Sequence, residues 1–150
     1  MTWTEVLGRV SFCNCDPVFE GISDSWKVFS APPSWLCGHV IRRDCVTAPV
    51  PTADYARFMD ELVLLPDLAI SGRGSAGSVL IFGNRPLDSM RDIAVPTDSS
   101  TSRKLLDWIL NENNLDPRRV EMAPDLGQML SGCDGALIIG DRALIESKNN

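Results

Sequence analysis

Short apolar runs alternate with segments of helical character along this chain, and that alternation restricts the possible folds more than any other feature. We expect strands at residues 6–10, 26–29, 45–50, 68–70, 78–82, 93–95, 120–122 and 136–139. Between them, helix signals mark a short segment opened by Pro17 and the segments 33–43, 52 onward, 101–112, 125–130 and 140 onward. Strands that alternate with helices indicate an α/β architecture with largely parallel sheets.

Local signals add detail to two of the predicted helices. The segment 101–112 combines a hydroxyl-rich start with a wide apolar face, which is typical of a helix packed on a sheet. Thr52 is expected to cap the helix that begins there. We expect Trp26, Trp35 and Trp108 to be buried or half-buried packing residues.

The charge of the chain excludes one class of partner. The 150 residues include 14 basic and 20 acidic side chains, which gives a formal net charge of −6. Binding to a phosphate backbone needs clustered Lys and Arg, and no such run occurs. No apolar run reaches the length of a membrane span, and the first ten residues do not resemble a secretory signal. We therefore expect a cytoplasmic protein that binds a small molecule or another protein.

The five cysteines are irregularly spaced and do not form a recognisable framework. Cys13 and Cys15 would face opposite sides of an extended segment, which disfavours a shared metal ion. We expect small buried or half-buried thiols in a reducing compartment, with no metal site and no cofactor.

Polar residues follow the predicted strands, where open α/β sheets bind their ligands. Free backbone N–H groups and the helix dipole at such places favour an anion, and hydroxyl groups add donors. An ordinary helix cap uses the same residue types, so both interpretations stay open at this level. The candidate positions are Ser11, Asn14, Thr52, Ser78, the segment 97–102, Gly140 and Asp141.

Other motifs give weaker signals. His39, the single histidine, lies in the predicted helix 33–43 and is expected to be structural or exposed rather than a catalytic base. The loop SGRGSAGS lacks the spacing of a nucleotide-binding loop. Neither a Ser-His-Asp triad nor a pair of catalytic carboxylates can be assembled.

Several blocks of the sequence resemble one enzyme family. The opening RVSFCNCDPVF resembles the start of bacterial chorismate dehydratases, which act in the futalosine route to menaquinone. The likeness continues in order along nearly the whole chain, through PPSWL, APVPTADYAR, LLPDLAIS, GSVLIF, PTDSSTSRKLL, MAPDL and DGALIIGD. On these blocks the chain is identified as a member of that family.

The resemblance implies a two-lobed fold like that of type II periplasmic solute-binding proteins, with the substrate between the lobes. Lobe one would hold residues 1–88, and lobe two would begin at residue 89. The implied reaction removes water from chorismate to give 3-[(1-carboxyvinyl)oxy]benzoate. Asn14 and Ser78 match the family's catalytic polar positions, and the implied substrate-binding residues are Ser11, Thr52, Ser99, Thr101, Ser102, Gly140 and Asp141.

The chain also departs from the family. Thr47 stands where an acidic residue is usual, and Pro51-Thr52 replaces a pair of serines, so one backbone N–H is lost. Family members continue well past residue 144, so we expect a truncated fold that self-associates or needs a complementing second half. The alternative functions are a non-catalytic solute-binding-like module for an aromatic carboxylate and the sister enzyme 1,4-dihydroxy-6-naphthoate synthase.

Overall fold

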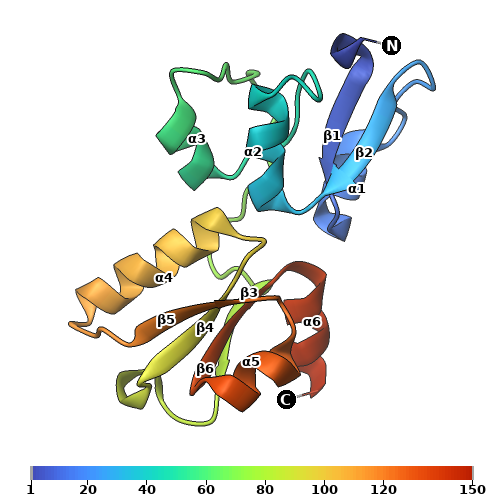
Figure 1. Cartoon of the computed structure of the whole chain (residues 1–150). Helices are drawn as coiled ribbons and strands as arrows, with labels where there is room; N and C mark the ends of the chain where they lie inside the picture. Colours follow the sequence, from blue (N-terminus) through green and yellow to red (C-terminus); the bar gives the residue numbers. More distant parts are fainter. Residues whose placement is uncertain (1, 150) are drawn as a thin grey trace. The chain divides into compact units, whose positions relative to one another are not determined.

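The structure, a computed structural model, describes residues 2–149 and is a mixed α/β protein. The chain divides into two compact units, Met1–Arg73 and Gly74–Asn150, which we describe separately (Figure 1). The boundary predicted from the sequence lay at residues 88 and 89. The strand at residues 79–83 pairs with a strand near the end of the chain and therefore belongs to the second compact unit. The assignment of these units to the lobes of a solute-binding-protein-like fold stays a prediction.

The first unit is built on two parallel strands, β1 (Val6–Val10) and β2 (Lys27–Ala31). Leu7 and Val10 of β1 are buried, and Leu36 packs into the same core. The remaining elements of this unit are η1 (Trp3–Glu5), η2 (Cys13–Cys15), α1 (Asp16–Phe19), α2 (Pro33–Ile41) and α3 (Thr52–Phe58).

Gly8 lies at the closest approach of β1 to its neighbours. A Cβ atom at this position would lie 2.8 Å from Cβ of Ala48 and 2.9 Å from Cδ2 of Leu36. Separations below 3.0 Å are sterically forbidden for carbon atoms, so α2 and the segment around Ala48 can reach this strand only because Gly8 has no side chain.

The predicted strand at residues 45–50 is wrong. The segment makes one isolated parallel bridge, between Leu7 and Thr47, with hydrogen bonds of 2.9 Å on either side of it. Pro49 follows at once, and proline has no N–H to continue a ladder. The predicted strand at residues 68–70 is also wrong, because the segment belongs to neither sheet. Its apolar residues Leu68 and Ile70 are exposed.

Two expectations for side chains also fail. Thr52 is the first residue of α3 rather than its cap, and the capping position is Pro51, which makes no side-chain hydrogen bond. Trp35 and Trp108 are each 60% exposed and Trp26 is exposed as well, so the tryptophans do not form the core.

The second unit has a four-stranded sheet in the order β3-β6-β4-β5. β4 runs parallel to both neighbours, whereas β3 is antiparallel to β6, which confirms a largely parallel arrangement. The strands are β3 (Val79–Gly83), β4 (Asp92–Pro96), β5 (Arg118–Met122) and β6 (Gly135–Ile139), and the helices are η3 (Leu87–Ser89), α4 (Ser100–Glu112), α5 (Leu126–Gly132) and α6 (Gly140–Asn149).

Helices cover both faces of this sheet (Figure 1). On one face, Ile93, Val95 and Leu137 pack against Leu106 and Leu110 of α4. On the other face, alternate residues of β4 and β6 pack with α5 and α6, through Ala94, Ala136, Ile138, Met129 and Ala143. All five residues of β6 are buried, as its uninterrupted apolar sequence predicts for a strand covered on both sides.

Asp134 fastens the start of β6 to the start of β4. Its carboxylate accepts hydrogen bonds from the backbone N–H and Nε of Arg91, both at 2.9 Å, and its own N–H donates to Asp92 at 2.7 Å. The hydrogen bonds from the Arg91 side chain and backbone hold the pKa of the Asp134 carboxyl far below its ordinary value.

The stability of the protein should therefore depend on the ionisation of Asp134. A carboxyl whose pKa is lowered in the folded state stabilises it above the unfolded-state pKa, near 3.9, and this contribution is lost as the pH falls. We expect Asp134→Asn to lower the urea midpoint at pH 7, with a smaller difference from the wild type as the pH falls from about 5 to 3.

Asp88→Asn is the matched control for this measurement. The Asp88 carboxylate is exposed and accepts a hydrogen bond from the hydroxyl of its neighbour Ser89. A difference between wild type and Asp134→Asn that did not change with pH would contradict the assignment.

Candidate functional site

Two predicted polar residues lie directly after β1. Ser11 is exposed, and its N–H donates to the carbonyl of Ala31 at 3.1 Å, which joins the ends of β1 and β2. Asn14 follows in the single turn of η2 and is also exposed. Thr52 is exposed at the start of α3, and no hydrogen bond within the described residues joins it to Ser11 or Asn14. The structure thus places Ser11 and Asn14 together at the carboxyl end of a strand, where ligands commonly bind.

Beside these residues lies an open groove that the sequence did not indicate. It has a volume of about 580 Å³, and an ion pair between Arg9 and Asp16 forms part of its wall. Nε of Arg9 is buried and has no hydrogen-bond partner among the described residues. The groove is lined by Arg9, Asp16, Pro17, Phe19, Glu20 and Val28.

The cysteines of this region differ sharply in exposure. Cys15 is fully buried, whereas Cys13 is exposed, so the expectation of buried or half-buried thiols is wrong for Cys13. Both residues lie in the 3₁₀ turn η2 rather than in the extended segment that the sequence predicted. Cys37, Cys45 and Cys133 are also buried, and burial raises the pKa of each of these three thiols. The thiolate is the reactive form, so these buried groups should react slowly.

Labelling of the native protein should therefore distinguish Cys13 from the other four. We expect one thiol per chain to react rapidly with a maleimide at pH 7, and the other four only when the protein is unfolded. Cys13→Ser should remove the rapid phase, with Cys133→Ser as the control that keeps it; mass spectrometry of the labelled chain gives both results. Rapid labelling of more than one thiol in the folded chain would show that the cores of the units open.

His39 is a structural residue of α2. Its Nδ1 lies 2.8 Å from a carboxylate oxygen of Asp44, and its ring packs edge-on against Phe29 with centroids 5.0 Å apart. The hydrogen bond between His39 and Asp44 was not anticipated, because Asp44 lies just beyond the end of the helix. The contact secures the turn after α2.

In the second unit, the structure brings three predicted clusters to one end of the sheet. The carbonyl of Ser78, just before β3, accepts the N–H of Gly140 at 2.8 Å. Gly140 has a φ of +67°, a left-handed conformation that glycine adopts without steric cost, and this permits the abrupt change from β6 to α6. Asp141 follows in the first turn of α6.

The third cluster is the segment 97–102 between β4 and α4. Ser99 caps α4, and its hydroxyl oxygen accepts the N–H of Ser102 at 3.3 Å. Ser99 is buried, Ser102 is half-buried and Thr101 is exposed on the first turn. This capping confirms the ordinary structural role of Ser99, and the hydroxyl group keeps its own hydrogen as a donor.

Asp98, which the sequence analysis did not single out, connects two of these clusters. Its Oδ2 accepts a hydrogen bond from Nη1 of Arg142 at 2.9 Å, so the loop before α4 is held to the first turn of α6. The Asp98 side chain is only 8% exposed. An acidic residue within a run of hydroxyl residues looks like a further cap, and the distant Arg142 leaves no local sign in the sequence.

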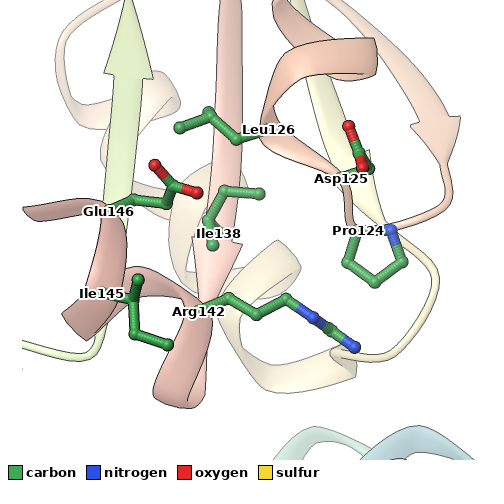
Figure 2. Close-up of a pocket in the computed structure, with 7 residues that line it drawn as sticks. All are labelled: Pro124, Asp125, Leu126, Ile138, Arg142, Ile145 and Glu146. Carbon is green, nitrogen blue, oxygen red and sulfur yellow. The ribbon is translucent and has the colours of Figure 1, made fainter. Parts of the chain in front are cut away.

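A smaller pocket of about 210 Å³ lies on the α5–α6 side of this sheet. Figure 2 shows Ile138 of β6 between residues of α6 and residues at the start of α5. Arg142, which holds Asp98, also forms part of this wall. The pocket contains none of the residues predicted for the site; it is lined by Pro124, Asp125, Leu126, Ile138, Arg142, Ile145 and Glu146.

Among residues 2–149, no group of three or more His, Cys, Asp or Glu side chains is arranged to hold a metal ion. None of the helices in this range is both long and apolar enough to cross a membrane.

The chain is a mixed α/β protein, and in each of its two units hydroxyl or amide groups lie at the ends of strands. Residues 6–150 match the family model described as menaquinone biosynthesis, and the chain belongs to that family. It is 31% identical over 140 residues to the chorismate dehydratase of Thermus thermophilus. That alignment covers 93% of this chain and 51% of the relative, so the chain spans about half the length of the curated protein it matches.

Proposed function

We propose that this chain provides the catalytic groups for the dehydration of chorismate to 3-[(1-carboxyvinyl)oxy]benzoate, on the futalosine route of menaquinone biosynthesis. The observation that carries the proposal is the 31% identity to a chorismate dehydratase along 93% of the chain. The family match and the polar groups at the strand ends support it. The sister reaction that forms 1,4-dihydroxy-6-naphthoate receives less support, because its expected histidine would be His39, which is engaged with Asp44.

The chemistry of chorismate suits a site made of neutral donors. The ring proton to be lost is acidified by conjugation to the ring carboxylate, and the product gains aromaticity. The protein then has to hold two carboxylates and stabilise the developing negative charge with hydrogen-bond donors. In this proposal the Asn14 amide and the Ser78 hydroxyl or N–H supply those donors. The proton passes to the side-chain carboxylate of the substrate itself.

The remaining residues would bind the substrate. The hydroxyls of Ser99, Thr101 and Ser102 lie at the N-terminal end of α4, where the helix dipole favours a carboxylate. Ser11, Thr52, Gly140 and Asp141 complete the proposed set. No cofactor is required for this reaction, since the substrate is neither oxidised nor reduced by an outside agent.

We also propose that the active form includes additional polypeptide, either a second copy or a complementing half. Within residues 2–73, the first unit contains only two paired strands, and sheets of this size are marginal in isolation. Apolar side chains are left in contact with water: Val63 is 93% exposed, Leu64 64% and Leu65 55%. Surfaces of this kind usually mark an interaction site.

A turnover assay tests the proposed reaction. Purified chain is mixed with chorismate, and the aromatic product is followed by ultraviolet absorbance and identified by mass. Light scattering on the same sample gives the oligomeric state. Product formation by a dimer or larger assembly would support both proposals. Failure of a folded chain to form product, alone or in an assembly, would leave a binding module for an aromatic carboxylate as the better description.

A further inference from the structure

Asp98 has a buried carboxylate in which, within the described residues, only one oxygen accepts a hydrogen bond. Oδ2 accepts the hydrogen bond from Arg142 at 2.9 Å. Oδ1 is buried and has no hydrogen-bond partner among the residues that the structure describes. Only 8% of the Asp98 side chain is exposed to solvent.

A role confined to stabilising the fold does not explain this arrangement. A buried acceptor without a donor destabilises a fold, and the effect is larger when the group is charged. Asp134 provides the comparison within the same unit, because it is similarly buried, at 10% exposure, but both of its oxygens accept hydrogen bonds from Arg91. A carboxylate that only fastened α6 to the loop before α4 could be satisfied in the same way.

The position of Asp98 points to a ligand as the missing donor. It directly precedes Ser99, the cap of the 13-residue helix α4, so its Cα lies about 3.8 Å from that of the capping residue. Backbone N–H groups in the first turn of a helix have no carbonyl partner within the helix and favour an anion. Arg142 offsets the charge of Asp98, so an anionic ligand can still bind beside it.

We infer that Asp98 is a specificity-determining residue whose Oδ1 accepts a hydrogen bond from a hydroxyl group of the ligand bound at the start of α4. This inference rests on the proposed function. Chorismate carries a ring hydroxyl that leaves as water, and the product has none. The substrate therefore satisfies the buried oxygen, and the product leaves it unpaired. Loss of this one hydrogen bond favours release of the product over the substrate.

The test compares two ligands that differ in this hydroxyl. KM for chorismate and Ki for added 3-[(1-carboxyvinyl)oxy]benzoate are measured for the full chain and for Asp98→Ala. We expect Asp98→Ala to raise KM roughly tenfold to a hundredfold, the range for a hydrogen bond to a charged group, and to leave Ki unchanged within about threefold.

Arg142→Met is the matched control, because it removes the same ion pair but keeps the Asp98 carboxylate. It should not change the ratio of KM to Ki by more than about threefold. Thermal unfolding followed by circular dichroism establishes that each variant is folded. If Asp98→Ala does not fold, Asp98→Asn replaces it; the amide keeps an oxygen for Arg142, and KM should rise while Ki stays the same.

The outcomes separate the inference from the proposed function. Equal changes in KM and Ki for the Asp98 variants would overturn the inference and leave the function standing. If the chain shows no turnover, chorismate is not consumed, and equilibrium dialysis of both ligands against the same proteins replaces the kinetics. Binding of neither ligand would overturn the function and the inference together, whereas selective loss of chorismate binding in Asp98→Ala would support the inference without catalysis.

Discussion

Asn14→Ala is expected to lower kcat for chorismate dehydration by about a hundredfold to a thousandfold, with a much smaller effect on KM. The amide of Asn14 is exposed in η2, directly after β1, and is proposed to donate to the charge that develops as the ring proton leaves. Removing one such donor from comparable sites has an effect of this size on the chemical step. The measurement is a steady-state assay that follows the aromatic product.

The control for this prediction is Asn111→Ala, which removes the same side chain from the exposed surface near the end of α4. It should leave kcat within about twofold of the wild type, since surface substitutions away from special features have small effects. An Asn14→Ala chain that raised KM at unchanged kcat would show that Asn14 binds substrate and transition state equally, contrary to its proposed role.

Gly8→Ala is expected to lower the free energy of unfolding by roughly 1–3 kcal/mol, the usual range for overpacking a filled core. The new methyl group would lie 2.8 Å from Cβ of Ala48 and 2.9 Å from Cδ2 of Leu36. The Cβ of Ala48 moves only with its backbone, which follows directly after the bridge between Leu7 and Thr47. Either β1 or the segment around Ala48 must therefore shift. Urea unfolding at pH 7 followed by circular dichroism measures the change.

Gly72→Ala serves as the comparison for Gly8, because a Cβ atom at Gly72 would meet nothing within 4 Å. It should leave the unfolding midpoint unchanged or raise it slightly, since alanine reduces the freedom of the unfolded chain. Equal stability of the two variants would mean that the core around β1 accommodates an extra methyl group easily.

The sequence predicted those elements whose own residues carry the signal. β1 and β6 are apolar runs bounded by polar residues, and α4 combines a hydroxyl cap with an apolar face, so all three were located to within a residue of their ends. The mixed α/β class follows from the same alternation. Segment 68–70 has an equally apolar composition but remains outside both sheets, because a strand also needs a partner that composition does not specify.

Contacts between distant residues could not be predicted in this way. The pairing of β3 with β6 in the antiparallel sense, and the placement of Ser78 beside Gly140, depend on which edge of the sheet remains open. The ion pair between Asp98 and Arg142 joins residues 44 positions apart. The candidate positions Ser99, Ser102 and Gly140 stand out because capping and tight turns have local signatures. The pairing of Asp98 with Arg142 has no local signature and was not predicted.

The order in which the strands of the second unit are made has a consequence for synthesis. Leu80 of β3 pairs with Ile138, and Ala94 of β4 pairs with Ala136, so both of these strands lack one partner until β6 has been made. A chain growing at roughly 5–20 residues per second exposes β3 for several seconds before that partner leaves the ribosome. During this interval the apolar strand is open to pairing with other nascent chains, and it is then that chaperones would contribute most to the yield of this protein.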